Sequence, residues 1–542
     1  MNYARLRKRA AILSLILGMV LFLSACGGNN NNNSGNAASQ TSETVNTEDS
    51  TETVESKVYR DILNIAITAQ PPLLDAHQTV SNAAAGISNH IFETLLTLDK
   101  DYLPVPQLAT SYDVSEDSLV YTFYLREGIK FHNGKELTSE DVVVSMNRWL
   151  IASSRAAALL SGAIFEAIDD YTLTLTVREA TSDIINLIAS PAQFPAVMPK
   201  EVVENIPAEG LSEYIGTGPY KFAEWRQDQY IRLEKYDEYK SLEGEVSGHT
   251  GARNGGTKEI YFYFVPDNST RIAGVKTGEY DIAESIPLEN YNEVASDENL
   301  VVNIKQSGSL NLFLNTSDGV LSNPVLRQAV LATLNNNEIL LASYAEPELY
   351  ILDPGFMNLV QTQWAVKSGA EYYNQANPEK AKELFTDGEY DDEPIRLLTT
   401  RDYSEMYNAT LVVQEQLRQV GVNAEVINFD FATFLETKND RTKWDIFITS
   451  NSYQLTPPQI SAVNPNWAGF DQPRVAEALL AIRQAESQEE ATKEWENLQQ
   501  YIYEFGAATV IGHYNSVIVT SKKIEGFNYF HNPVYWNTRI AE

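Results

Sequence analysis

The sequence predicts an α/β protein that folds as more than one lobe. After residue 378, apolar runs with strand and helix periods alternate, which indicates βαβ units around central parallel strands. The chain has 542 residues, too many for one ordinary hydrophobic core, so two or three lobes are expected.

Local patterns place the elements in order. In the first half, Thr138 can accept a hydrogen bond from a free backbone N–H and Asp141 suits a positive helix start, so a helix is expected to begin there. Asn323-Pro324 begins another helix. Apolar runs predict strands at 63–67, 120–125, 171–177, 221–225 and 260–265. After residue 378, helices are expected at 381–385, 411–420 and 431–437, and strands at 395–399, 424–429 and 444–449.

The N-terminus has the pattern of a lipoprotein export signal. Four cations precede fourteen mostly apolar residues, and Leu23-Ser24-Ala25-Cys26 ends the segment. The apolar run is shorter than the roughly 20 residues that a membrane-spanning helix needs, so residues 1–25 are expected to be removed. Cys26 is the only cysteine, which excludes a disulfide framework and favours its lipidation. We therefore expect anchoring to the outer face of the cell membrane.

Residues 26–57 are expected to be a disordered tether behind the lipidated cysteine. The segment is rich in Asn, Ser, Thr and acids and has almost nothing to bury. A coil of this length spans roughly 30 Å.

The charge balance limits the possible partners. Without residues 1–25, the chain keeps 36 basic and 73 acidic residues, a formal charge of −37. Nucleic-acid binding needs clustered Lys and Arg, so no nucleic acid is expected as a partner. The acidic surface also disfavours adsorption on anionic lipid through protein charge, which leaves the lipid as the anchor.

Enzyme motifs are absent from the sequence. It has no nucleophile elbow, phosphate loop or zinc-protease motif, and its six histidines show no i, i+4 pair. We expect no catalytic residue, metal site or cofactor. The glycine-rich stretch at 216–220 is interpreted as a turn, because Pro219 removes an amide donor and no helix follows.

Several ordered motifs resemble one family, the solute-binding proteins of oligopeptide, dipeptide and nickel ABC importers (bacterial solute-binding family 5). The resemblance covers nearly the whole chain after the signal, and its motifs lie at 106–112, 121–134, 137–142, 216–220 and 278–282. It implies a non-catalytic, extracytoplasmic and monomeric receptor that hands its solute to the transmembrane subunits of a permease.

The fold implied by this resemblance is a two-lobed periplasmic-binding-protein-like clamp (type II) with an extra subdomain. Lobe I would combine residues 58–95, 215–307 and 513–542, with the subdomain at 96–214, and lobe II would cover 308–512. A solute would bind between the lobes and favour the closed state by its differential affinity for it.

The resemblance also suggests ligand-binding residues. Thr79, Val80 and Ser81 map to a loop that offers main-chain hydrogen bonds to an extended peptide. If Pro457 matches the family proline, Ser450, Asn451 and Tyr453 line the cleft, and Tyr453 stands where peptide binders have an ammonium-binding Asp. A phenol carries no charge at neutral pH, so the binding of a peptide's α-ammonium group at this position is expected to be weaker than with Asp.

Arg401 follows a strand, at the edge where open α/β sheets bind ligands, and it is a candidate for pairing a carboxylate or chelate. The alternative is a surface ion pair with Asp402 or Glu405.

Two further segments are given structural roles. Phe92 and Glu93 are expected to be a core residue and a helix cap. Residues 241–258, with five glycines, are expected to form a flexible surface loop.

Three functions are compatible with these observations. The first is a receptor for a peptide or peptide-like solute. The second keeps the scaffold but takes a metal–chelate complex or a sugar. The third, a surface peptidase, lacks any catalytic constellation in the sequence.

Overall fold

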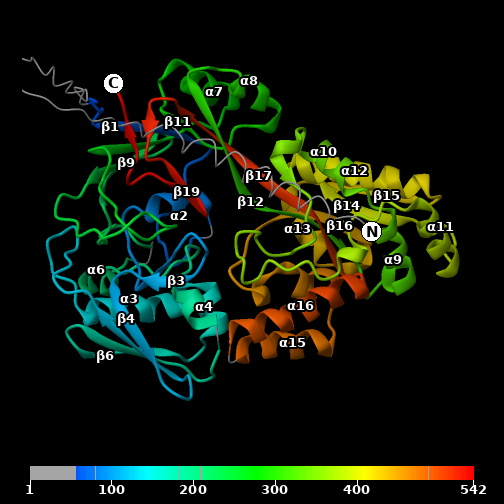
Figure 1. The fold of residues 1–542 in the computed structure, drawn as a ribbon, viewed down its shortest axis with the longest axis horizontal. Helices are drawn as coiled ribbons and strands as arrows, with labels where there is room; N and C mark the ends of the chain where they lie inside the picture. Colours follow the sequence, from blue (N-terminus) through cyan, green and yellow to red (C-terminus); the bar gives the residue numbers. More distant parts are fainter. Residues whose placement is uncertain (1–56, 80, 182, 208–209, 486) are drawn as a thin grey trace, which may run out of the picture. The chain divides into compact units, whose positions relative to one another are not determined.

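An 11-stranded sheet organises the protein (Figure 1). The computed structural model describes residues 57–542 except 80, 182, 208–209 and 486. The predicted signal peptide, the lipidated Cys26 and nearly all of the tether, up to residue 56, therefore lie outside the described residues, as does Val80.

The strand order joins two groups of parallel strands. β1 pairs in parallel with β10 and β11, and β14 pairs in parallel with β15 and β16, which confirms the predicted α/β class. From one edge the strands are β15 (Ala424–Phe429), β14 (Ile395–Thr400), β16 (Ile446–Ser452), β12 (Leu300–Leu314), β17 (Ala508–Ser521), β11 (Ile282–Ala283), β1 (Ile62–Ile67), β10 (Glu259–Phe264), β9 (Tyr230–Lys235) and β8 (Tyr220–Arg226). β13 (Tyr350–Ile351) pairs with β17 off this path.

Two long antiparallel strands, β12 and β17, connect the groups. The first half of β12 pairs only with β17, whose far end also pairs with β11, and the second half of β12 also pairs with β16. We call the part with β1 and β8–β11 lobe I and the part with β14–β16 lobe II. The predicted lobe boundaries at 307/308 and 512/513 fall inside these two strands.

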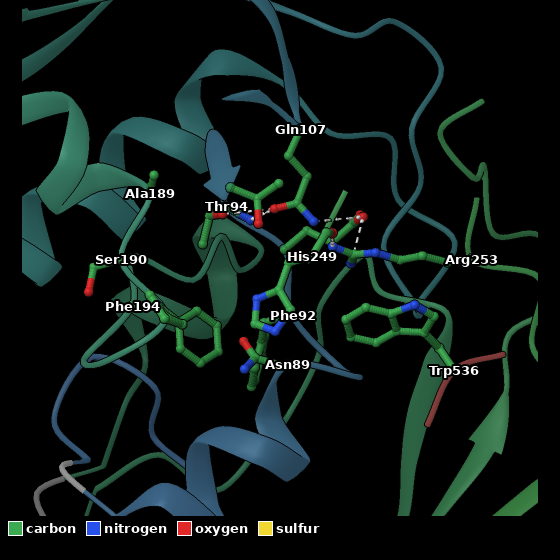
Figure 2. Close-up of a pocket in the computed structure, with 13 residues that line it drawn as sticks. Asn89, Phe92, Thr94, Gln107, Ala189, Ser190, Phe194, His249, Arg253 and Trp536 are labelled. Atoms are coloured by element: carbon green, nitrogen blue, oxygen red, sulfur yellow. Dashed lines mark hydrogen bonds and ion pairs between the residues drawn. The ribbon is translucent and has the colours of Figure 1, made fainter. Parts of the chain in front are cut away.

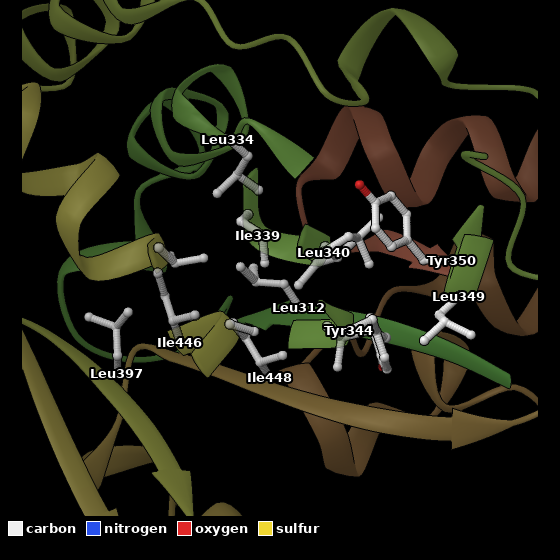
Figure 3. Packing of buried hydrophobic residues seen from close by; sticks show 14 of the residues in the cluster. Leu312, Leu334, Ile339, Leu340, Tyr344, Leu349, Tyr350, Leu397, Ile446 and Ile448 are labelled. Carbon is white, nitrogen blue, oxygen red and sulfur yellow. The ribbon is translucent and has the colours of Figure 1, made fainter. Parts of the chain in front are cut away.

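Lobe II packs its helices around β14–β16 (Figure 1). Leu312, Ile446 and Ile448 from the sheet meet Ile339 and Leu340 of α10 in a fully buried cluster (Figure 3). Burial of such side chains contributes about 1.5–3 kcal/mol each. The helices are α9 (Pro324–Thr333), α10 (Asn336–Tyr344), α11 (Pro378–Asp387), α12 (Ser404–Gln419), α13 (Phe431–Lys438), α14 (Pro465–Ala468), α15 (Pro473–Gln484) and α16 (Gln488–Phe505).

Lobe I carries α2 (Asn82–Ser88), α7 (Asn268–Thr277) and α8 (Tyr291–Ala295). Asp267 caps α7 by accepting a hydrogen bond from the Thr270 N–H at 2.7 Å. Late in the chain, the short pair β19 (Asn528–Phe530) and β20 (Asn532–Val534) returns to α2. β18 (Ile524–Glu525) pairs with β21 (Arg539–Ile540).

A four-stranded antiparallel sheet forms a separate core below lobe I (Figure 1). α3 begins directly after Thr138, as predicted, and Asp141 caps this end by accepting a hydrogen bond from the Thr138 N–H at 3.1 Å. The elements of this region are β2 (Leu96–Leu98), β3 (Pro104–Pro106), β4 (Ala109–Val114), β5 (Val120–Leu125), α3 (Ser139–Ala152), α4 (Ser154–Leu159), β6 (Ile164–Asp169), β7 (Thr172–Thr176), α5 (Asp183–Ile188) and α6 (Lys200–Glu204).

Two element boundaries differ from the predictions. α12 begins at Ser404 instead of residue 411, because Met406, Ala409 and Thr410 are already buried but polar residues between them interrupt the apolar pattern. β16 continues to Ser452, beyond the apolar run, because its polar end pairs with Gly308–Leu310 of β12. Among the described helices, none is long and apolar enough to cross a membrane.

Candidate functional site

Two cavities adjoin each other, one where the lobes meet and one within lobe I. The first, which we call the interlobe cavity, has a volume of about 200 Å³ and draws its walls from the end of β16, from β12 and β17, from the loop after β11 and from the β19–β20 hairpin. The second, the adjoining cavity, also measures about 200 Å³ and extends along the start of α2. The two share Asn82, Glu284, Ser285, Asn532 and Pro533.

The two connecting strands form the polar floor of the interlobe cavity. Ser307 lies at an irregularity of the β12–β17 pairing, and its hydroxyl is 2.6 Å from that of Ser516. Gly308 follows, where a Cβ atom would lie 2.3 Å from the Asn451 carbonyl oxygen and 2.5 Å from the Tyr514 hydroxyl. Only glycine therefore allows the three strands to approach this closely.

Tyr453 lines the interlobe cavity as a neutral group. Its hydroxyl lies 2.7 Å from Nδ1 of His513, and the two rings stack with centroids 5.8 Å apart. Burial raises the pKa of Tyr453 and lowers the pKa of His513 to about 4. Near neutral pH this pair supplies hydrogen bonds and a ring surface but no charge.

The charged group that lines both cavities is Glu284, directly after β11. One of its oxygens accepts a hydrogen bond from the Tyr535 hydroxyl at 2.5 Å. Burial raises the pKa of Glu284 to about 7, although the side chain is only half-buried and faces the cavities. No Lys, Arg or His among the described residues lies within ion-pair distance of it.

Arg271 holds the backbone around Glu284 in place. Its fully buried guanidinium donates to the carbonyl oxygens of Glu284 and Ser285 at 3.0 and 2.7 Å. Ser285 adopts a φ of +53°, a conformation that is unfavourable for a residue other than glycine. Tyr102 and His531, which also line the interlobe cavity, have φ values of +62° and +61°. Backbone strain of this kind is often concentrated at functional sites.

The predicted ligand residues are distributed unevenly around this site. Tyr453 lines the interlobe cavity and Ser81 lines the adjoining cavity, where it also caps α2 by accepting from the Ala84 N–H at 3.3 Å. Thr79 is buried and accepts a hydrogen bond from the Ser81 N–H.

The remaining predicted residues have partners within the protein. Ser450 donates to Glu405 at 3.4 Å, and Asn451 accepts from Ser461 at 3.1 Å. Arg401 is exposed and donates to the Tyr407 hydroxyl at 3.1 Å instead of pairing with Asp402 or Glu405.

Of the residues that line the cavities, sequence reasoning identified only Ser81 and Tyr453, and three of those it missed carry polar groups without internal partners or with a single one. Glu284 lies just beyond the family motif at 278–282, so only its exposure to a cavity distinguishes it. Gln306 and Asn532 line the interlobe cavity, and each has a buried side-chain nitrogen without a hydrogen-bond partner in the described structure. Such orphan donors depend on tertiary structure and have no sequence signature.

A different polar pocket lies inside lobe I (Figure 2). It measures about 20 Å³ and is lined by Gln107, His249, Arg253 and Trp536 around the buried Glu93. The Glu93 carboxylate accepts hydrogen bonds from Tyr239, Thr217, Gln107 and Arg253 at 2.9 to 3.4 Å. With so little space and so many internal partners, this cluster is structural.

This pocket corrects two predictions. Glu93 is not a helix cap, because it lies after α2 in an irregular segment and its carboxylate pairs with Arg253. Residues 241–258 are not simply a flexible surface loop, since His249 and Arg253 are buried and Arg253 stacks 4.4 Å above the Trp536 ring. Phe92 is a core residue, as expected.

The fold and the cavity define a class: a two-lobed solute-binding protein whose site lies between the lobes. The chain belongs to the bacterial extracellular solute-binding proteins, family 5, whose model matches residues 104–472. This is a family of binding proteins and not of enzymes. The described residues contain no group of three or more His, Cys, Asp or Glu side chains that could hold a metal ion.

Relatives cover most of the chain. A probable peptide ABC transporter periplasmic-binding protein of Sinorhizobium fredii is 30% identical over 68% of this chain and 72% of its own length. The glutathione-binding protein GsiB of Pectobacterium atrosepticum is 26% identical over 85% of this chain and 90% of its own. The crystal structure of the ABC transporter substrate-binding protein CtaP from Listeria monocytogenes shares the fold, with a TM-score of 0.78, 20% identity and coverage of 90% of this chain and 100% of that one.

Proposed function

We propose that this protein captures a peptide or peptide-like solute in the interlobe cavity and delivers it to the transmembrane subunits of an ABC importer. The observation that carries the proposal is the position of the cavity on β12 and β17, the two strands that link the lobes. Rotation of the lobes about these strands would change the shape of the cavity and couple binding to a conformational change. The names of the relatives from Sinorhizobium and Pectobacterium support a peptide or a peptide-like cargo.

In this proposal Tyr453 and Ser81, which line the cavities, contact the solute directly. The main chain at Thr79 and Val80 offers the solute hydrogen bonds, and Ser450 and Asn451 are further contacts; Val80 lies outside the described residues. Arg401 is exposed outside both cavities, so it would meet cargo only when the lobes approach. The lobes are bounded at residues 307/308 and 512/513. The protein acts as a monomer held outside the cytoplasm by a lipid on Cys26.

The first test is native mass spectrometry of the protein purified from its host without denaturation. A ladder of co-purified peptide masses is expected. One metal-containing adduct would overturn the peptide proposal in favour of a chelate, and one carbohydrate mass would do so in favour of a sugar.

A second test addresses the role of Tyr453. Tyr453→Asp places a carboxylate in the interlobe cavity and is expected to raise affinity for peptides with a free amino terminus about tenfold, measured by calorimetry. Tyr124→Asp provides a control, because it makes the same change at an exposed side chain that lines neither cavity. Unchanged affinity in Tyr453→Asp would remove Tyr453 from the proposed contact set.

The anchor is tested separately. In Cys26→Ala the protein is expected to move from the membrane fraction to the soluble fraction of the host, because protein charge gives no substitute attachment. Retention of this variant in the membrane fraction would contradict the lipid anchor.

A further inference from the structure

We propose that the Glu284 carboxylate binds a protonated amino group of the cargo. Asn532 and Gln306 donate hydrogen bonds to the carbonyl oxygens that follow this amino group in the cargo. This inference rests on the proposed function and specifies which end of the solute is recognised and by which lobe. It places the charged contact in lobe I, at the junction of the two cavities, and not at Tyr453 in lobe II.

Buried acidic side chains elsewhere in the protein form ion pairs with basic side chains. Seven Asp and Glu side chains are buried among the described residues, and each has a Lys or Arg nitrogen within 4.0 Å. An unpaired charge in a desolvated place is costly, so this pairing is expected. The pairs are Asp75–Arg148, Glu93–Arg253, Asp141–Lys135, Asp183–Arg483, Asp281–Arg60, Asp353–Lys367 and Asp445–Arg396.

Glu284 is desolvated as well but has no such partner. Its one recorded side-chain contact is the Tyr535 hydroxyl, and burial raises its pKa to about 7. The nearby Arg271 is engaged with main-chain oxygens and the Asn268 side chain, so it does not form an ion pair with the carboxylate. A cation supplied by a ligand would give Glu284 the kind of ion pair that the seven buried acids already have. Glu405, the other half-buried acid whose pKa is raised by burial, lines neither cavity.

Two hydrogen-bond donors without an acceptor lie around the same cavity. Asn532 is 4% exposed, and its side-chain nitrogen has no partner; the buried side-chain nitrogen of Gln306 also has none. Both residues line the interlobe cavity with Glu284. Buried donors without acceptors are rare in native proteins, and a bound ligand is one way to satisfy them.

Together these groups describe the complementary ligand. One anionic acceptor and two amide donors match a primary ammonium followed by carbonyl oxygens, which is the chemistry of the amino end of a peptide. The strained backbone at Ser285 and the fixed Arg271 contacts keep the carboxylate in place before the ligand arrives, which limits the ordering cost of binding.

The test uses two synthetic libraries of tri- to pentapeptides built from uncharged residues, one with free amino termini and one acetylated. Each library is incubated with the purified full chain, and retained peptides are counted by native mass spectrometry. The wild-type protein is expected to retain free-amine peptides at least ten times better than acetylated ones. Glu284→Gln is expected to lose at least tenfold of that affinity and the preference itself.

The matched control is Glu289→Gln. It makes the same change in charge five residues further along the chain, at an exposed site outside both cavities, and it should retain peptides as the wild type does. Circular dichroism checks that both variants are folded.

The remaining outcomes separate the two proposals. Equal retention of both libraries, or a Glu284→Gln variant that behaves as the wild type does, would overturn the role of Glu284 and leave the peptide-binding function standing. If the wild type retains neither library, the peptide-binding function fails, and the inference fails with it.

Discussion

Two glutamates of lobe I, Glu93 and Glu284, each lie beside a cavity. They differ in how many hydrogen-bond and ion-pair partners the protein provides for the carboxylate. Glu93 has four donors, including a stacked arginine, around a space of about 20 Å³. Glu284 has one donor and opens onto two cavities of about 200 Å³ each. A buried acid with internal partners contributes to stability, whereas an acid that lacks them and faces a cavity is the better candidate for binding a ligand.

The largest expected effect comes from breaking the internal pair. Arg253→Met leaves the Glu93 carboxylate buried without a cation, and we expect a loss of about 3–5 kcal/mol in the free energy of unfolding. Urea unfolding followed by tryptophan fluorescence measures it. Glu284→Gln, the counterpart, should be at least as stable as the wild type at pH 7.5. A loss below about 1 kcal/mol for Arg253→Met would remove the distinction between the two sites.

The second prediction is that Glu284 makes the free energy of unfolding depend on pH. The folded protein keeps the Glu284 proton up to about pH 7, whereas the unfolded chain releases it near 4.5, so the folded state binds more protons in that window. The free energy of unfolding should therefore fall by about 3 kcal/mol from pH 4.5 to 7 relative to Glu284→Gln. The other ionisable groups around Glu284 do not titrate there, because burial raises the pKa of Tyr535 and Tyr529, lowers the pKa of His531 to about 4, and Arg271 stays charged.

Unfolding of both proteins at pH 4.5 and at pH 7 gives this difference directly, and shifts of other groups cancel between them. A difference that does not change with pH would mean that Glu284 is already ionised and solvated in the free protein.

The smallest effect tests the strained loop that presents Glu284. Ser285→Gly relieves the φ of +53° and is expected to raise the free energy of unfolding by at most about 1 kcal/mol, since glycine also increases the entropy of the unfolded chain. The melting temperature reports it. Ser307→Gly is the control: this residue has no positive φ and its hydroxyl contacts Ser516, so the melting temperature should fall. A similar fall in both variants would show that Ser285 carries no strain.

Sequence reasoning succeeded where physical signals are local. Apolar runs predicted most strands of both parallel groups, although not β11, and the residues Asn323-Pro324 and Thr138 marked helix starts correctly. The position of Tyr453 beside the cavity agrees with the family-based hypothesis, whereas Arg401 lies on the exposed surface.

Other features depend on contacts between distant segments. The burial of Arg253 depends on Glu93, 160 positions earlier in the chain, so a glycine-rich composition was a poor guide to that loop. Glu284 faces Tyr535 from 251 positions away, and Gln306 and Asn532 become orphan donors only when the cavity is assembled. Periodicity carries no information about such partners.

The two long strands that link the lobes also restrict how the protein can move. β12 and β17 are paired from Leu300–Ser521 to Phe313–Ala508, and this pairing is interrupted only at two register shifts, between Gln306 and Gly308 and between Leu310 and Asn311. Sliding one lobe past the other would break the paired hydrogen bonds on both sides of these shifts, whereas twisting and bending the ribbon would keep them. We therefore expect the lobes to rotate relative to each other with little sliding.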